Sequence, residues 1–165
     1  GLIAASDIVV ATENAGFELS EVLFGLIPAN VLPYLVPGRL SAARARALVL
    51  TSRRLSAEEA LGAGLIDELC GGEEAEKRLK KLIGRLFKAA PRALAETKRY
   101  FHDAQYLDFD GRKAEGRDKL IDLLFDDEVR AGIRSFQEGM VPDWFAKFRP
   151  ERPLFIGAGS EEKGK

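Results

Sequence analysis

The pattern of apolar and polar positions divides the chain into a first part with short strands and a later part with amphipathic helices. Ile8-Val-Val-Ala11 is an apolar run rich in β-branched residues, which predicts a short buried strand. A second strand is predicted at residues 65–69, and a short extended segment at residues 17–19. The small apolar residues at 2–5 favour a buried helix.

Two helices of the first part have recognisable ends. Ser41 is the expected N-cap of a helix that runs to residue 50. Its predicted apolar stripe comprises Leu40, Ala43, Ala47 and Leu48. Ser56 and Glu59 have the spacing of a capping box, which opens a short helix at Ala57–Ala63. Gly64 follows it as a left-handed C-cap.

From Glu73 onward the pattern predicts charged, amphipathic helices. Apolar residues recur with helical spacing at Leu79, Leu82, Ile83, Leu86 and Phe87, and the remaining face carries Lys77, Arg78, Lys80, Lys81, Arg85 and Lys88. This basic face is either a solvated surface or a binding surface for a phosphate-bearing carrier, and the pattern favours the solvated surface. Further helices are predicted at 91–107, 112–125 and 127–136, the last capped by Asp126. A loose tail is predicted at 149–165.

Composition and charge narrow the function classes. Hydrophobic residues make up 46% of the 165 residues, as in an ordinary soluble domain, and the formal net charge of -1 gives no argument for nucleic acid or an anionic membrane. The single cysteine, Cys70, excludes an internal disulfide and fits a reducing compartment. No His/Cys/carboxylate cluster has metal-ligand spacing. We therefore expect a cytoplasmic protein with no metal and no nucleic-acid or membrane partner.

One carboxylate stands out as candidate chemistry. In the run from Leu19 to Ala29, Glu21 has only Ser20 as another polar side chain, and Gly25 and Pro28 then break the run into a turn. Burial of a carboxyl without a partner charge favours its protonated form, so that it can both donate and accept a proton near neutral pH. The residues alone leave two alternatives open: a glutamate that faces water at a strand end, or an acid/base in a dry pocket.

Four segments in series resemble a known family. They are Asp7-Ile-Val-Val-Ala-Thr12, Phe17-Glu-Leu-Ser-Glu21 with Gly25-Leu-Ile-Pro28, Leu50-Thr-Ser-Arg-Arg-Leu-Ser-Ala-Glu-Glu-Ala60, and Gly64-Leu-Ile-Asp67. Their order and spacing resemble the second half of the crotonase (enoyl-CoA hydratase/isomerase) family. The segment from Phe17 to Pro33 resembles in particular the dehydratases of polyketide β-branching, which act on 3-hydroxy-3-methylglutaryl groups carried by an acyl carrier protein.

The resemblance implies a fold and an assembly. The fold would be α/β, the C-terminal portion of a crotonase (ClpP-like) spiral of ββα units at residues 1–72. A helical trimerisation region would follow at 73–148, then a flexible tail at 149–165, in a homotrimer or dimer of trimers. The chain opens inside a small apolar run, so we expect the glycine-rich loop that supplies oxyanion donors to precede Gly1. We expect the chain to be a fragment or one half of a split protein, inactive by itself.

The resemblance also implies roles for single residues. Glu21 stands at the position of a catalytic glutamate, and the substrate contacts would come from Gly1, Leu26, Pro28 and Phe136. Hydratases carry a second glutamate at the position of Gly1, so its absence favours a dehydratase with a single acid.

Two further positions bear on the substrate and on catalysis. Gly139 replaces a lysine that touches coenzyme A in the family, which favours a carrier-protein substrate. The single histidine, His102, is expected to be a capping or surface residue.

The expected function is that of a lyase in polyketide biosynthesis. It would dehydrate a 3-hydroxyacyl thioester of the 3-hydroxy-3-methylglutaryl type on an acyl carrier protein, with no cofactor besides the acyl-carrier or acyl-CoA thioester itself. One alternative is a general enoyl-CoA hydratase/isomerase. An alternative of another class is a non-catalytic crotonase half that acts as a scaffold.

Overall fold

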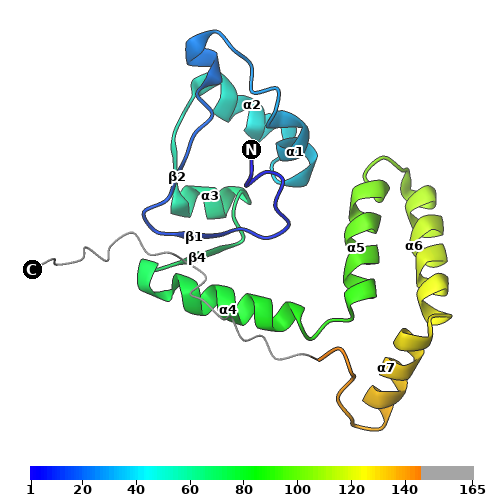
Figure 1. Ribbon diagram of the computed structural model, residues 1–165. Coiled ribbons are helices and arrows are strands. Elements are labelled where there is room, and N and C mark those ends of the chain that lie inside the picture. The colour runs from blue at the N-terminus through cyan, green and yellow to red at the C-terminus, as the bar shows by residue number, and fades with distance from the viewer. Residues whose placement is uncertain (146–165) are drawn as a thin grey trace, which may run out of the picture. The chain divides into compact units, whose positions relative to one another are not determined.

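The computed structural model describes residues 1–145, apart from the side chain of Pro37, and the chain forms two compact units (Figure 1). The first unit is Gly1–Leu79, and the second begins at Lys80. The predicted tail at 149–165 lies outside the described residues.

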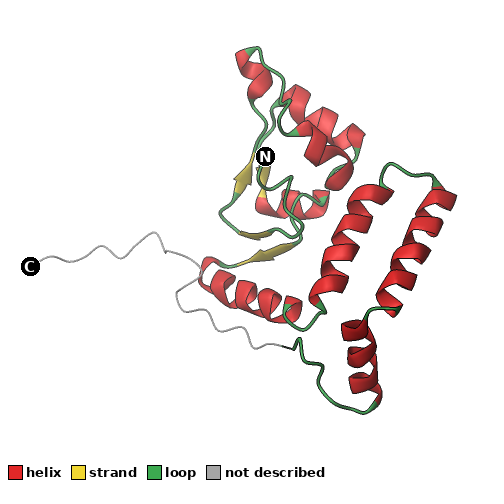
Figure 2. Cartoon of the chain, turned by 45° about the vertical axis from the view of Figure 1, so that its right-hand side comes forward, coloured by secondary structure: helices red, strands yellow, loops and turns green. Residues whose placement is uncertain are grey.

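Two short strand pairs form the sheet layer of the first unit, and Figure 2 shows them in yellow. β1 (Val10–Thr12) pairs in parallel with β4 (Glu68–Cys70), with Ala11 opposite Leu69. β2 (Gly16–Phe17) pairs antiparallel with β3 (Leu55–Ser56). The strands predicted at 8–11 and 65–69 are thus confirmed, although each begins later than predicted. The reason is that Val9 O accepts the N–H groups of both Asp67 and Glu68, so regular pairing begins only beyond this contact.

Short helices follow and separate these strands. They are η1 (Glu21–Phe24), α1 (Leu32–Gly38), α2 (Ala42–Thr51), α3 (Ala57–Ala63) and η2 (Gly72–Glu74). α3 contacts β2, β3 and β4, and α2 contacts α1 and η1. The core of the first unit is built from Ala4, Val9, Ala11, Leu35, Leu40, Ala45, Leu48, Leu55, Ala60, Leu65 and Ile66.

The predicted caps are present. Ser41 Oγ accepts the N–H of Arg44 at 3.3 Å. Ser56 Oγ accepts the N–H of Glu59 at 3.2 Å, and Glu59 Oε2 accepts the N–H of Ser56 at 2.9 Å, which completes the capping box. Hydrogen bonds from Arg53 and from the Ser56 N–H lower the pKa of Glu59. Gly64 ends α3 with φ at 82°, in the left-handed region that favours glycine.

The predicted apolar stripe of α2 was wrong in two of its members. Ala43 and Ala47 are exposed, and the face that enters the core is formed by Ala45, Leu48 and Val49. An alanine gains little from burial, so the larger Leu48 and Val49 set the rotation of the helix.

The predicted helix at residues 2–5 was also wrong, because this segment forms turns. The N–H of Ala5 donates to Gly1 O and that of Ser6 donates to Ile3 O, each at 3.1 Å. Ser6 Oγ donates to Leu2 O, and the side chain of Leu2 is 89% exposed. Of this segment only Ala4 enters the core, so it lacks the continuous apolar face that stabilises a helix.

The second unit consists of helices. α4 (Ala75–Leu86) crosses the division between the units and is followed by α5 (Pro91–Ala104), α6 (Phe109–Leu124) and α7 (Asp127–Gln137). α6 contacts both α5 and α7. All four helices were predicted, but α5 ends and α6 begins before the predicted residues, because Asp108 caps α6 by accepting the N–H of Gly111 at 2.8 Å.

Asp126 is the predicted cap of α7 and joins it to α5. Its carboxylate accepts the N–H of Val129 at 3.0 Å and forms an ion pair with Arg92. The hydrogen bond from Val129 and the charge of Arg92 lower the pKa of Asp126. A buried glycine, Gly132, lies directly against the Trp144 ring and leaves no room for a larger side chain.

The capping box generates a stability prediction. Ser56→Ala is expected to lower the free energy of unfolding by about 1 kcal/mol, because the Glu59 N–H loses its acceptor at the first turn of α3. Ser135→Ala is the matched control, since that hydroxyl only donates to Ala131 O inside α7. Urea denaturation of both variants measures the difference, and equal midpoints would contradict the prediction.

Candidate active site

Glu21 is the first residue of η1, a single 3-10 turn between β2 and α1. The turn is closed by backbone hydrogen bonds, since the N–H of Gly25 donates to Val22 O and the N–H of Leu26 donates to Glu21 O. Gly25 has φ at 74°, a conformation that glycine adopts without strain. The turn predicted from Gly25 and Pro28 is confirmed, and it fixes the backbone that carries the carboxylate.

One oxygen of the Glu21 carboxylate is shielded from water and lacks a hydrogen-bond donor. Oε2 is inaccessible to solvent, and no described residue donates to it. Among the described side chains, only Ser52 Oγ is another buried polar atom in this state. A buried carboxylate oxygen without a donor is unfavourable, and such groups call for a functional explanation. One oxygen of Glu21 is thus shielded, and the choice between the two alternatives stays a prediction.

The apolar side chains around Glu21 do not enter the core. Leu23, Phe24 and Ile27 are exposed, and the Leu26 side chain is 63% exposed. Pro28 is buried, and its carbonyl accepts the N–H groups of Val31 and Leu32 at 3.0 Å. The turn is thus anchored at Pro28 while its apolar tip stays accessible.

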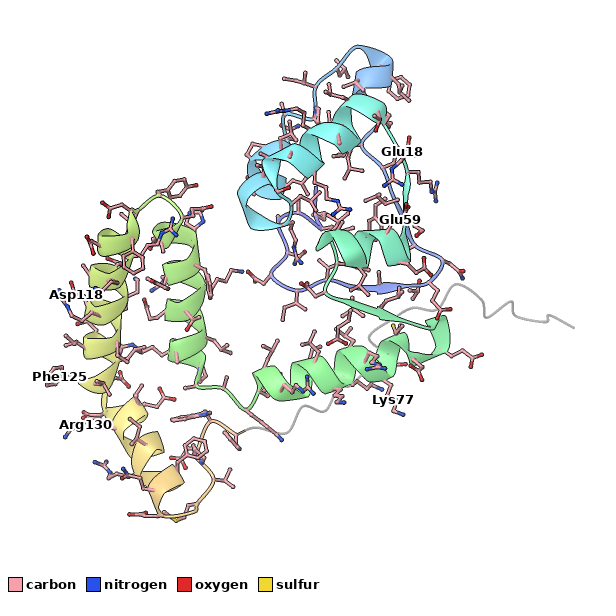
Figure 3. The ribbon with its side chains drawn as sticks, turned by 180° about the vertical axis from the view of Figure 1, so that it is seen from behind. Glu18, Glu59, Lys77, Asp118, Phe125 and Arg130 are labelled. Carbon is pink, nitrogen blue, oxygen red and sulfur yellow. The ribbon has the colours of Figure 1, made fainter. Side chains whose placement is uncertain are left out.

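A cavity of about 220 Å³ lies inside the first unit, between the segments that precede and follow Glu21. Its walls are mostly apolar, with Glu18 and Arg53 as the charged side chains. It is lined by Gly1, Ile3, Ala4, Gly16, Phe17, Glu18, Leu19, Val31, Leu35, Leu40, Leu48, Arg53, Leu55 and Leu65. Glu21 is not part of this lining. Figure 3 labels Glu18, near the strand pair β2–β3, and Glu59 on α3.

The structure brings most of the predicted site residues into the first unit. Glu21, Leu26 and Pro28 belong to one turn, and Gly1 lines the cavity opposite Val31, whose Cγ2 would stand 3.8 Å from an added Cβ. Phe136 lies outside this group, on α7 in the second unit. Its ring packs edge-on against Phe145, with ring centroids 5.8 Å apart. The substrate roles of these residues stay predictions.

Glu18 and Arg53 are charged cavity residues that sequence reasoning missed. Arg53 is separated from Glu18 by more than thirty residues and reaches the cavity because β3 pairs with β2. Its guanidinium also forms an ion pair with Glu59 at 2.5 Å. The available signal in the sequence was the alternation of apolar Phe17, charged Glu18 and apolar Leu19, but strands of two residues are too short to fix the pairing register from such a pattern.

Other candidate chemistry finds no site in the described residues. His102 is exposed in the last turn of α5, with its ring edge-on to Tyr106, as predicted for a surface histidine. Over residues 1–145, the structure holds no cluster of three or more metal-ligating side chains. None of the helices in this range is long and apolar enough to cross a membrane.

Comparison with known proteins gives the family. A family model described as enoyl-CoA hydratase/isomerase matches residues 1–147. The chain belongs to this family. The bacillaene synthase dehydratase PksH of Bacillus subtilis (strain 168) is 32% identical over 143 residues, which are 86% of this chain and 54% of that protein. A carnitinyl-CoA dehydratase of Salmonella typhi is 28% identical over 147 residues, 87% of this chain and 56% of that protein.

Solved structures confirm the crotonase fold. An enoyl-CoA hydratase/isomerase from Marinobacter aquaeolei superposes with a TM-score of 0.82 at 29% identity, over 88% of this chain and 55% of that one. Pseudomonas aeruginosa AtuE superposes with a TM-score of 0.83 at 28% identity, over 88% of this chain and 57% of that one. The chain spans about half the length of the relatives it matches.

The Gly25 turn generates a prediction. Gly25→Ala is expected to lower the free energy of unfolding by roughly 1–2 kcal/mol, because an alanine at this positive φ is strained although its Cβ would meet no atom. Gly62→Ala is the control, since Gly62 lies inside α3 with open space at its Cβ and alanine favours a helix. Thermal unfolding by circular dichroism compares the two, and a Gly25→Ala melting temperature at or above that of Gly62→Ala would refute the strain.

Proposed function

We propose that the protein is a crotonase-family lyase that dehydrates a 3-hydroxyacyl thioester, with Glu21 as general acid/base. The observation that carries the proposal is the Glu21 carboxylate, to which no described residue donates a hydrogen bond, held on a turn whose apolar tip is accessible. An acid/base group must have an oxygen free to exchange a proton with the substrate. Membership of the family and similarity to two dehydratases support dehydration as the reaction.

In the proposed reaction, Glu21 transfers one proton. Dehydration removes a proton from the α-carbon and the hydroxyl from the β-carbon, and yields a 2-enoyl thioester and water. Protonated Glu21 gives its proton to the departing β-hydroxyl, which would otherwise leave as hydroxide. The α-proton is acidic while N–H donors stabilise the thioester enolate, and it passes to the Glu21 carboxylate, which then gives it to the leaving hydroxyl. The reaction needs no cofactor besides the thioester.

The proposed substrate is a 3-hydroxy-3-methylglutaryl group on an acyl carrier protein. The similarity to a bacillaene synthase dehydratase supports this class. Gly139 supports the carrier over coenzyme A, because it adopts φ at 70°. A lysine in this conformation would be strained by roughly 1–2 kcal/mol, so the backbone disfavours the phosphate-contacting lysine of the family pattern.

The proposed assembly is a homotrimer or dimer of trimers. Large aromatic side chains on α5 and α6 are exposed, among them Phe101 and Phe109, as is Phe125 directly after α6. Exposed apolar surface of this kind is typical of a protein interface.

Two other functions are kept as alternatives. The similarity to a solved enoyl-CoA hydratase/isomerase favours a general hydratase or isomerase that acts on coenzyme A thioesters. A non-catalytic scaffold is the alternative of another class, and it predicts that Glu21 is dispensable.

The acid/base role gives the first functional prediction. Glu21→Gln removes the transferable proton and keeps the shape of the side chain, so turnover is expected to fall by about 10²–10⁴-fold while folding is unchanged. The assay measures dehydration of a 3-hydroxyacyl thioester by the protein as its gene encodes it. Glu13→Gln is the matched control, since Glu13 is exposed on the loop after β1. Activity of Glu21→Gln within a factor of two of the parent would refute the assignment and favour the scaffold.

The carrier preference gives the second functional prediction. The value of kcat/KM is expected to be higher for the acyl group on its carrier protein than for the same group on coenzyme A, because Gly139 offers no side chain to a coenzyme A phosphate. Steady-state assays of both substrates at equal ionic strength decide it. An equal or better value with coenzyme A would favour the general hydratase/isomerase.

A further inference from the structure

Four cations form a stripe along α4 and the turn after it. Lys77, Lys81 and Arg85 are spaced by four residues and lie on one face of α4, and Lys88 follows in the turn after the helix. All four side chains are exposed. The opposite face carries Leu79, Leu82 and Ile83, which are partly buried. We call Lys77, Lys81, Arg85 and Lys88 the basic stripe. Figure 3 labels Lys77, whose side chain projects from α4 into solvent.

The basic stripe gathers cations without ion-pair partners in succession along one helix. No described carboxylate lies within ion-pair distance of its four members. Several other cations of the described residues meet carboxylates. Examples are Lys119 with Glu96 and Glu115, Arg99 with Glu96, Arg92 with Asp126, and Arg78 with Glu74. Arg44, Arg54 and Arg134 also lack an ion pair among the described residues but do not form a row along one helix face.

Interactions within α4 do not explain why the four cations of the basic stripe lie together. Like charges four residues apart destabilise a helix. The helix dipole favours cations at the C-terminal end, which explains Arg85 and Lys88 but disfavours Lys77 near the start of α4. The formal net charge of the chain is -1, so the stripe is a local concentration of positive charge rather than part of a basic protein. An anionic partner would remove this repulsion.

We propose that the basic stripe docks the acyl carrier protein through an acidic helix of the carrier. From Lys77 to Arg85 the stripe extends about 12 Å along the helix, with a charge at about every 6 Å. A single phosphate meets one or two side chains, whereas a helix with carboxylates four residues apart repeats at the same spacing and meets the whole stripe. Complementary charge of this kind accelerates association. The docking role rests on the proposed acyl-carrier substrate.

The experiment reverses the stripe and compares three substrates. The variant Lys77→Glu/Lys81→Glu/Arg85→Glu is assayed with one acyl group on the carrier protein, on coenzyme A and on N-acetylcysteamine, in the protein as its gene encodes it. We expect kcat/KM to fall by about tenfold or more with the carrier alone, because steering charges raise association rates by this order. We also expect the parent rate with the carrier, and not with N-acetylcysteamine, to fall as salt rises.

Matched controls separate docking from other causes. Arg117→Glu/Arg130→Glu/Arg134→Glu makes the same charge change on exposed positions of α6 and α7 and is expected to act like the parent. If the reversed variant melts below the parent, the glutamine variant Lys77→Gln/Lys81→Gln/Arg85→Gln replaces it.

Every other result of these assays would overturn the proposed docking of the carrier on the basic stripe. An equal fall with coenzyme A and carrier, but not with N-acetylcysteamine, assigns the stripe to a phosphate. An equal result with all three substrates, or an equal effect in the control variant, shows that the stripe has no specific role. If the parent turns over none of the three thioesters, the proposed function itself fails.

Discussion

The first unit depends on one ion pair, between Arg39 and Asp67. Arg39 Nη1 donates to Asp67 Oδ2 at 2.7 Å, and the same oxygen accepts the N–H of Val9 at 2.7 Å. Arg39 Nη2 donates to Ser6 O at 2.7 Å. The contact therefore joins the end of α1, the turn that begins the chain and the segments that lead into β1 and β4. The Arg39 side chain is 7% exposed and that of Asp67 is 41% exposed, so loss of Asp67 would leave a shielded guanidinium with the Ser6 carbonyl as its remaining partner, which is destabilising.

This junction also shapes the cavity of the first unit. The turn held by Ser6 brings Gly1, Ile3 and Ala4 to the cavity wall, and α1 supplies Leu35 to the same wall. Between the cavity residues Leu19 and Val31, the chain leaves the core and forms the turn with Glu21. Leu19 and Val31 are partly buried against the core, so both ends of the turn are anchored.

The proposed catalytic glutamate and the proposed carrier-binding surface need opposite environments. The proposed acid/base needs exclusion of water and of hydrogen-bond donors, a condition met by one oxygen on a short 3-10 turn. The proposed carrier surface needs the reverse, solvent-exposed charges that act over distance and are screened by salt. Both lie on elements with little burial of their own, η1 and α4, which are supported by packing elsewhere in the chain.

The sequence by itself determined the features that depend on near neighbours. The caps at Ser41, Ser56 and Asp126 were predictable because each hydrogen bond spans three residues, and the helices of the second part followed from their apolar spacing. The order of the motifs around Glu21 likewise pointed to the family. Only the tertiary structure decided the rest. Contacts between distant segments decide which face of α2 is buried and how the two-residue strands pair. They also bring Arg53 and Glu18 to one cavity. A local sequence pattern does not include the energies of these contacts. The lack of a hydrogen-bond donor to Glu21 Oε2 is also a tertiary feature, because the residues that pack around an oxygen decide whether a donor reaches it.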